Sequence, residues 1–472
     1  MGKIDNISLF CSDPPAYYGQ SLTKMQSQPR EDYERLQLAA LRLRFEQLRD
    51  AIPMVQKLAD AEGVREINRV EDVIPLLFDH TMYKSYPPSF LHNNRFDQMT
   101  RWLNKLTTVD LSGFDASDCP TVDDWVVKLY ERTPLNVVHT SGTTGLFSFL
   151  PRTKSNWDFF MRQYRVSVLQ EFGKESPLAE YPLNIHAIYP YFRSGGGHLM
   201  LNDLYVKYIC GGEERFHAAY PGRLSSNLLL LFSRMRAAAA RGELDRFEIS
   251  PDLMARRDEF VKLQETKDEH VAHFFDELSQ KLRGERVFIQ AVPAMLYQMA
   301  KTGLARGDRG LFARDSIIIA GGGAKGAVLP DNWDDYVKHY LGVDRVTQIF
   351  GMGEMITFFP LCEGGHYHVM PGILPFILDP ETSKPLARQG RVTGRWAYYD
   401  LVSDAHWGGF ISGDEVTMNW DAGCSCGRRT PYLEKSIRRY SEISKGGDKI
   451  TCAATEAAYQ EAMDFLIAAD AR

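Results

Sequence analysis

The chain has 472 residues, of which 44% are hydrophobic and 25% are charged, and its net charge is −6. These proportions are average for soluble globular proteins and argue against disorder and against a membrane class. The mildly acidic balance argues against a broad nucleic-acid-binding face. The length suits roughly two to four domain-sized units, or one large α/β domain with an appendage.

No apolar run approaches the about 18 residues that a membrane-spanning helix needs, and the N-terminus lacks the apolar core of a signal peptide. Seven cysteines are an odd number, which fits a reducing compartment better than a disulfide framework. We therefore expect a cytoplasmic protein with neither a membrane nor a nucleic acid as partner.

Two stretches have a helical pattern. Residues 31–62 repeat apolar side chains at helical spacing, and Pro53 marks a break between two helices. Residues 223–286 are rich in Ala, Leu, Arg and Glu and predict a helical insertion. We expect this insertion either to cap a substrate pocket or to form an oligomer surface, such as that of a homodimer.

Short apolar runs alternate with helical stretches in the rest of the chain. The runs VVHTSGTTG and LNIHAIYPYFRSGGGHLM each predict a strand that leads into a glycine-rich loop. Further strands are expected in RVFIQAV, DSIIIAGGG, RVTQIFGMGE and PFILDP. This alternation predicts a mostly parallel α/β sheet, in which ligands bind at the carboxyl ends of the strands.

The segment 140–145, TSGTTG, offers four hydroxyl groups and two glycines directly after an apolar pair. Such a loop can point backbone N–H groups and hydroxyls at one anion. An ordinary polar turn is the alternative. The loop is not a Walker A motif, because no Gly-Lys-Ser/Thr follows at the required spacing.

The segment AGGGAKG at 320–326 formally matches G-x-G-x-x-G after a strand. A dinucleotide-binding fold would also place an acidic residue near the end of the next strand. Asp344 instead precedes that strand, and Pro330 falls where the phosphate-binding helix should run. Both observations argue against a Rossmann fold.

Three further residues suit a nucleotide. Phe350 can stack on a base, Glu354 can ligate Mg²⁺ through its carboxylate, and Asp414, expected after a strand and a glycine, can accept hydrogen bonds from ribose hydroxyls. Taken singly, Phe350 could be a core residue, Glu354 a surface residue and Asp414 a turn residue. Their occurrence together, in this order along the chain, favours one nucleotide site.

The ordered motifs TSGTTG, AGGGAKG, FGMGE, ISGD and IRRYSEISKGGDKI resemble those of the adenylate-forming superfamily of acyl- and aryl-CoA ligases, peptide-synthetase adenylation domains and luciferases. The chain looks most similar to the phenylacetate-CoA ligase and acyl-protein synthetase branch, from about Asp32 to the C-terminus. The resemblance implies an α/β fold with a large adenylation domain of stacked, mostly parallel sheets with flanking helices over 1–437. Residues 438–472 would form a hinge and a truncated or vestigial C-terminal lid.

The resemblance also implies roles for individual residues. The ATP phosphates would be bound by Ser141, Gly142, Thr143, Thr144 and Gly145, with Thr143 and Glu354 serving catalysis. The adenine would be bordered by Gly322, Gly323, Ala324, Phe350, Gly351 and Met352. Glu354 would ligate Mg²⁺, Asp414 would bind the ribose, and Arg438 or its neighbour Arg439 would contact the ribose before the hinge.

The sequence departs from this family in three places. Gly353 stands where the family usually has a threonine, and the lysine common shortly after the first loop is not at its usual place. The catalytic lysine of the lid has no counterpart, since no lysine follows Lys449.

Two compact segments carry candidate metal ligands. LCEGGHYHVMP contains Cys362, His366 and His368, and DAGCSCGRRTP contains Cys424 and Cys426. Three thiolates and one imidazole can close a tetrahedral zinc site, whereas free cysteines are the alternative. The resemblance favours His368 as the imidazole ligand and implies a structural zinc.

The run IYPYFRSGGG resembles the family loop that lines the carboxylic-acid pocket. Its expected pocket residues are Tyr189, Tyr191, Phe192, Ser194 and Gly196. Aromatic residues beside glycines are also good packing residues, so a place in the core is the alternative.

These features predict a ligase that uses ATP and Mg²⁺ to activate a small carboxylic acid as an acyl-adenylate, with an aryl acid favoured over a fatty acid. Pyrophosphate would leave, and the acyl group would pass to CoA or, alternatively, to a protein thiol, an amine or a hydroxyl. A non-catalytic ATP-binding scaffold and a zinc-stabilised oxidoreductase using NAD are hypotheses from other classes.

Overall fold

The computed structural model describes residues 3–140, 146–169, 179–243, 249, 251–322, 328–421, 423–440 and 462–466. The expected phosphate loop at 141–145, the adenine-bordering residues Gly323 and Ala324, and most of the expected lid lie outside the described residues.

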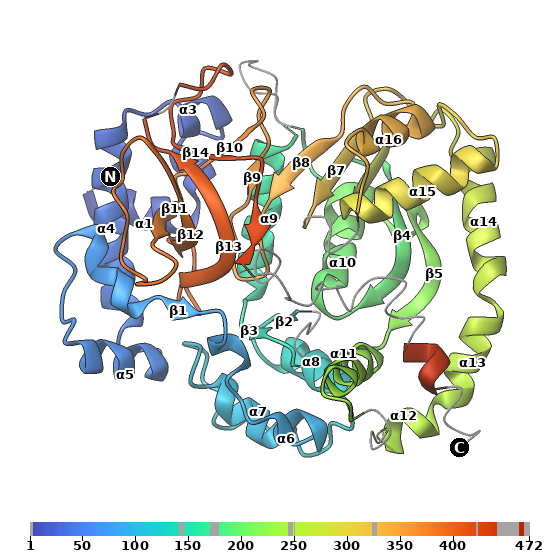
Figure 1. The fold of residues 1–472 in the computed structure, drawn as a ribbon, viewed down its shortest axis with the longest axis horizontal. Coiled ribbons are helices and arrows are strands. Elements are labelled where there is room, and N and C mark those ends of the chain that lie inside the picture. The colour runs from blue at the N-terminus through green and yellow to red at the C-terminus, as the bar shows by residue number, and fades with distance from the viewer. Residues whose placement is uncertain are drawn as a thin grey trace.

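A six-stranded sheet forms one half of the molecule (Figure 1). Its first five strands run parallel, and only the last pair is antiparallel. In spatial order the strands are β5 (Phe216–Leu224), β4 (His186–Gly195), β6 (Val287–Ala291), β7 (Ile317–Gly321), β8 (Thr347–Phe350) and β9 (Phe359–Pro360). The predicted strands in RVFIQAV, DSIIIAGGG and RVTQIF are therefore confirmed.

A seven-stranded sheet forms the other half, and it is antiparallel except for the pair of β1 with β13. The main path runs β10 (His366–His368), β14 (Tyr432–Glu434), β13 (Gly409–Asn419), β12 (Arg391–Asp400) and β11 (Ile373–Leu378), while β1 (Phe78–Asp79) and β15 (Arg438–Arg439) add to β13. The α/β fold of two large sheets with flanking helices is confirmed. The expectation of mostly parallel strands holds for one sheet only, because the paired strands of the second run antiparallel except for β1 with β13.

Helices cover both sheets. The N-terminal helices are α1 (Lys3–Ser12), α2 (Pro14–Tyr17), α3 (Leu22–Gln26), α4 (Arg30–Leu48) and α5 (Pro53–Glu62). They lie beside the seven-stranded sheet, and Pro53 begins α5 as predicted (Figure 1). The following helices are α6 (Pro88–His92), α7 (Phe96–Leu103), α8 (Val122–Arg132), α9 (Lys154–Ser167) and α10 (Leu201–Tyr205). Short helical turns are η1 (Val70–Leu76), η2 (Met82–Lys84), η3 (Gly197–Met200), η4 (Val206–Cys210) and η5 (Glu213–Arg215).

The predicted helical insertion at 223–286 begins within β5 and continues as α11 (Ser226–Ala240), α12 (Pro251–Ala255), α13 (Arg257–Glu265) and α14 (Lys267–Gln280). Two more helices, α15 (Pro293–Ala305) and α16 (Trp333–Leu341), follow β6 and β7. Among the described helices, none combines the length and the apolar character needed to cross a membrane.

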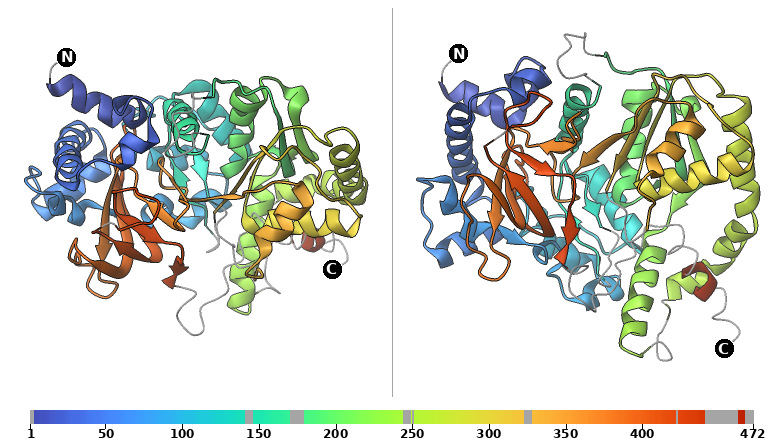
Figure 2. Two further views of the ribbon diagram at one scale, coloured as in Figure 1. Left: turned by 90° about the horizontal axis from the view of Figure 1, so that it is seen from above. Right: turned by 45° about the horizontal axis from the view of Figure 1, so that its top comes forward.

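Helix α9 lies between the two sheets (Figure 2). On one side the Tyr164 hydroxyl donates to Gln290 of β6 at 2.6 Å, and on the other the Asn156 amide donates to Asp404 at 3.0 Å. Buried side chains from both halves belong to one continuous hydrophobic cluster. The two sheets therefore share a core across α9.

Arg44 of α4 fixes the N-terminal helices to the seven-stranded sheet. Its buried guanidinium donates to the backbone carbonyls of Leu401 at 2.8 Å, Cys11 at 2.9 Å and Val402 at 3.3 Å. These carbonyls belong to α1 and to the turn that directly follows β12. One cation thus holds a helix and a turn that are far apart in the sequence.

Replacement of Arg44 by methionine should destabilise the fold by about 3 kcal/mol, because three carbonyls would lose their donor in a buried place. Urea unfolding followed by tryptophan fluorescence measures the change. The control is Arg35→Met on the same helix, whose side chain is 79% exposed and pairs with Asp32; we expect a change within about 0.5 kcal/mol. Equal effects of the two variants would contradict the role of Arg44.

Candidate functional site

Asp414 and Arg439 lie on neighbouring strands. In the pairing of β13 with β15, Asp414 is opposite Arg439, and Glu415 is opposite Arg438. The Arg439 Nε lies 3.5 Å from the Asp414 Oδ1, while Arg438 forms an ion pair with Glu415. Of the two arginines that the sequence left open, Arg439 is therefore the one beside Asp414.

Asp414 was expected after a strand, but it lies inside β13. The strand continues to Asn419 because β12 remains paired with it across an irregularity between Arg395 and Ala397. The carboxylate of Asp414 therefore projects from a paired strand and not from a loop.

Glu354 lies in the irregular segment between β8 and β9 and is half-buried. Burial raises the pKa of its carboxyl group, the charges of Arg152 and Arg439 act in the opposite direction, and Asp414 raises the pKa further. Glu354, Asp414 and Arg439 thus come from three separate elements into electrostatic contact. They make one mixed-charge site where the two sheets meet.

Phe350 ends β8 and is only partly buried. Its ring centroid lies 5.9 Å from those of Phe359 and Tyr367 and 6.2 Å from that of Trp396. Aromatic neighbours hold the ring in place, and part of it remains accessible. Gly351 and Met352, which follow it, are also partly exposed.

The described residues show how the expected phosphate loop is held at its base. Strands β2 (Val138–His139) and β3 (Phe149–Leu150) form an antiparallel hairpin on either side of it. The Thr140 N–H donates to the Ser148 carbonyl, and the Ser148 N–H donates to the Thr140 hydroxyl, both at 3.0 Å. A β-carbon added at Gly353 would lie 3.8 Å from the Thr140 methyl group. The base of the loop is therefore next to the segment that carries Glu354.

His139 joins a buried network that sequence reasoning missed. Its Nε2 lies 2.9 Å from the Ser226 hydroxyl, which donates to Asp123 at 2.6 Å. The imidazole stacks on Phe147 with ring centroids 4.6 Å apart. The network links the hairpin to the N-termini of α8 and α11. Its members are separated by 87 and 103 residues, so no local motif marks them.

The residues expected to line the acid pocket lie mainly in a strand and not in a loop. Tyr189, Tyr191 and Phe192 belong to β4 and are at most 5% exposed. The rings of Tyr191 and Phe192 pack against each other and against Tyr220. Ser194 is partly exposed, and its hydroxyl donates to the Gly222 carbonyl at 3.3 Å. The aromatic rings are core residues here.

Gly196 follows β4 and closely approaches the His139 network. A β-carbon at this position would lie 1.9 Å from the His139 Nε2 and 2.8 Å from the Ser226 hydroxyl. The His139 imidazole therefore fits at this position because Gly196 has no side chain.

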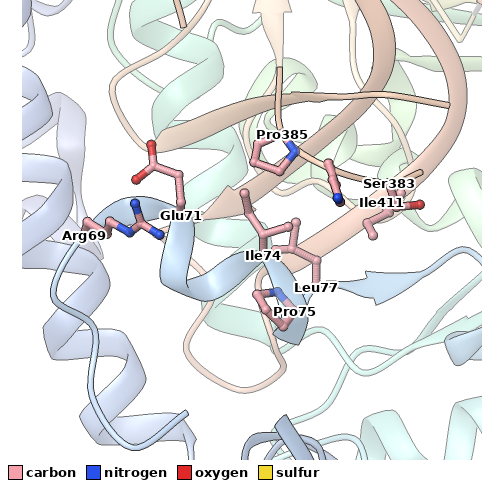
Figure 3. Close-up of a pocket in the computed structure, with 9 residues that line it drawn as sticks. Arg69, Glu71, Ile74, Pro75, Leu77, Ser383, Pro385 and Ile411 are labelled. Atoms are coloured by element: carbon pink, nitrogen blue, oxygen red, sulfur yellow. The ribbon is translucent and has the colours of Figure 1, made fainter. Parts of the chain in front are cut away.

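A hollow of about 480 Å³ lies away from these residues, between η1, residues 383–385 and β13 (Figure 3). Ile74, Leu77 and Pro385 gather around it, and Arg69 and Glu71 lie at one end. Its lining contains none of the residues that the sequence predicted to contact a ligand.

Four side chains expected to bind zinc lie together. The ligand atoms of Cys362, His368, Cys424 and Cys426 are all within 4.8 Å of one another. The Cys362 and Cys424 sulfurs are 3.6 Å apart, and the Cys426 sulfur is 3.3 Å from the His368 Nε2. A tetrahedral zinc with bonds of about 2.0 to 2.3 Å has ligand–ligand edges of about 3.5 to 3.8 Å. The set therefore fits zinc.

His368 is better placed than His366 for this role. His368 is fully buried, and its Nδ1 lies 2.9 Å from the Thr430 carbonyl. That contact makes Nδ1 the donor and leaves the Nε2 lone pair facing the cysteines. His366 instead packs on Tyr432, with ring centroids 4.2 Å apart, although its Nδ1 is 3.3 Å from the Cys424 sulfur.

Comparison with known proteins finds solved structures with a similar fold. No protein-family profile and no curated protein sequence matches the chain. The open conformation of 2-hydroxyisobutyryl-CoA ligase, in complex with 2-HIB-AMP and CoA, has a TM-score of 0.50 and 13% identity over 89% of this chain and 72% of that chain. The same ligase in its thioesterification state has a TM-score of 0.49 and 14% identity over 88% and 70% of the two chains.

At this identity the likeness concerns the fold alone. The chain shares the overall fold of 2-hydroxyisobutyryl-CoA ligase, which agrees with the α/β fold that the ordered motifs imply. The resemblance to the phenylacetate-CoA ligase branch in particular stays a prediction.

Replacement of Gly196 by alanine should destabilise the protein by about 2 kcal/mol, because its methyl group would displace the His139 imidazole. Thermal unfolding measures the change, with Gly113→Ala as a control since a β-carbon there meets open space. In a His139→Ala background the Gly196 substitution should have little further effect. Additive losses would contradict the proposed close contact.

Proposed function

We propose that this protein is an ATP-dependent ligase that activates a carboxylic acid as an acyl-adenylate and releases pyrophosphate. The observation that carries the proposal is the convergence of Glu354, Asp414 and Arg439 from three elements of a CoA-ligase fold. Asp414 and Arg439 would bind the ribose hydroxyls, and the partly exposed ring of Phe350 would stack on the adenine.

The chemistry of such a site is electrostatic. Carboxylate oxygens are preferred Mg²⁺ ligands, so Glu354 would hold the ion, which offsets negative charge on the phosphates when bound. Hydroxyls and N–H groups of 141–145, Thr143 in particular, would bind the phosphates while the substrate carboxylate attacks the α-phosphorus. The hairpin of β2 and β3 supports the proposal by bringing the base of that loop beside Gly353.

Two finer features are part of the proposal. We infer that CoA is the acyl acceptor, with a protein thiol, an amine or a hydroxyl as alternatives. An aryl acid remains the favoured substrate on the resemblance of residues 188–197 to an acid-binding loop, although the rings of Tyr191 and Phe192 are buried. A substrate panel therefore has to include both aryl and fatty acids.

Pyrophosphate release with ATP, Mg²⁺ and a panel of aryl and fatty acids, with and without CoA, tests the activity. Glu354→Ala should lower the rate on the order of 100-fold or more, because charge on the phosphates would lose its counter-ion. The control is Glu381→Ala, at an exposed turn, which should keep the wild-type rate. Binding of ATP without pyrophosphate release for any acid would instead support the non-catalytic scaffold.

We propose further that the four-residue cluster holds one structural zinc ion. The zinc would join β10 to the segment before β14, on the edge of the sheet that carries Asp414. No substrate role is required of it, because the four protein ligands complete a tetrahedron.

Metal analysis of the purified protein should find about one zinc per chain. Cys426→Ser and His368→Ala should lower the zinc content and the unfolding temperature, because a three-ligand site binds zinc more weakly. His366→Ala and Cys119→Ser should retain the metal. A zinc-free wild-type protein, or loss of zinc from the His366 variant alone, would refute this assignment.

A further inference from the structure

The segment 351–358 has no regular secondary structure, although it is buried from Met355 onward. It carries Glu354 at its centre. Backbone N–H and C=O groups in such a segment cannot pair within a helix or sheet, and burial removes water as a partner. Two charged side chains, Arg152 and Asp400, supply partners for residues 353 and 355–357.

Arg152 binds the carbonyls on both sides of Glu354. It follows β3, is 3% exposed, and its Nη2 donates to the Gly353 carbonyl at 2.6 Å and to the Met355 carbonyl. Its guanidinium also lies over the ring of Trp157, 4.8 Å from the centroid. Two hydrogen bonds from one planar group define where the backbone turns at Glu354.

Asp400 binds the next N–H groups of the same segment. This residue ends β12 and is 1% exposed. Its Oδ2 accepts from Ile356 N at 2.8 Å and from Thr357 N at 3.1 Å, and its Oδ1 accepts from Val402 N at 3.1 Å. Opposite charges on two separate elements therefore hold consecutive carbonyl and amide groups around Glu354.

We propose that Arg152 and Asp400 are positioning residues that orient the Glu354 carboxylate toward the metal–nucleotide complex. This inference rests on the proposed adenylation activity. Neither side chain needs to touch the substrate. Apolar residues of similar size would satisfy the packing at lower desolvation cost, but they could not hold the carbonyls and amides that determine the direction of Glu354.

The charge of Arg152 also acts on Glu354 through space. Burial raises the pKa of the Glu354 carboxyl group, and Arg152 and Arg439 oppose that increase. The charged and titratable groups that interact with Glu354 electrostatically are Arg152, Arg439, Asp414, Tyr83, Lys84 and Tyr398. Arg152 therefore acts on Glu354 both through the backbone carbonyls that it holds and through its charge.

The experiment measures pyrophosphate release by the full chain against Mg²⁺ concentration, for Arg152→Gln, Arg152→Lys and Asp400→Asn. We expect Arg152→Gln to lower kcat at least tenfold and to raise the Mg²⁺ concentration at half-saturation at least fivefold. Arg152→Lys should recover part of each effect. Arg162→Gln, on the adjoining helix and 46% exposed, is the matched control and should behave as wild type.

A double mutant separates positioning from general stability. In a Glu354→Gln background, Arg152→Gln should cause little further loss of activity, since both act through one carboxylate. An equal loss in both backgrounds, with the Mg²⁺ dependence unchanged, would overturn the inference. If Arg152→Gln does not fold, Arg152→Lys and Asp400→Asn carry the same comparison. Wild-type protein that releases no pyrophosphate would overturn the proposed function and this inference together.

Discussion

Buried backbone without regular secondary structure must find hydrogen-bond partners, and the loop at 351–358 meets this constraint through side chains of other elements. The carbonyls on both sides of Glu354 are bound by a residue after β3, the Phe358 carbonyl by Gln163 of α9, and the Ile356 and Thr357 amides by the end of β12. The small hairpin and the antiparallel sheet are thereby connected to the end of the parallel sheet. The geometry of Glu354 depends on all three.

The N-terminal helices contribute to the same arrangement. Arg44 of α4 holds the carbonyls of Leu401 and Val402, directly after Asp400. The Gln26 carbonyl at the end of α3 accepts from the amides of Arg429 and Thr430, beside the cysteine–histidine cluster. The N-terminal helices thus support both the segment that carries Glu354 and the cysteine–histidine cluster.

Prediction from the sequence succeeded where a structural feature follows from a local pattern of residues. The strands β6, β7 and β8, the break at Pro53 and the clustering of four cysteine and histidine side chains all follow from short runs of residues. The same reasoning could not choose between Arg438 and Arg439, because that choice depends on the register of β15 against β13. The antiparallel second sheet was missed because the pairing of strands is a non-local property.

Arg152 and the network of His139, Ser226 and Asp123 show most clearly what could not be predicted from the sequence alone. Each is an ordinary polar residue in its local sequence, and each acquires its role from partners between 87 and 203 residues away. The aromatic residues of β4 show the converse. Their local pattern suits a ligand pocket, yet burial in the parallel sheet makes them core.

The contacts of α3 and α4 have a consequence for the order of folding. The Gln26 amide donates to the Met370 sulfur, and the Gln37 amide donates to the Pro371 carbonyl, contacts that span 344 and 334 residues. At synthesis rates of about 5 to 20 residues per second, the early helices wait roughly 20 to 70 s for these partners to emerge from the ribosome. The packing of these early helices against the antiparallel sheet is therefore completed only after most of the chain has been synthesised.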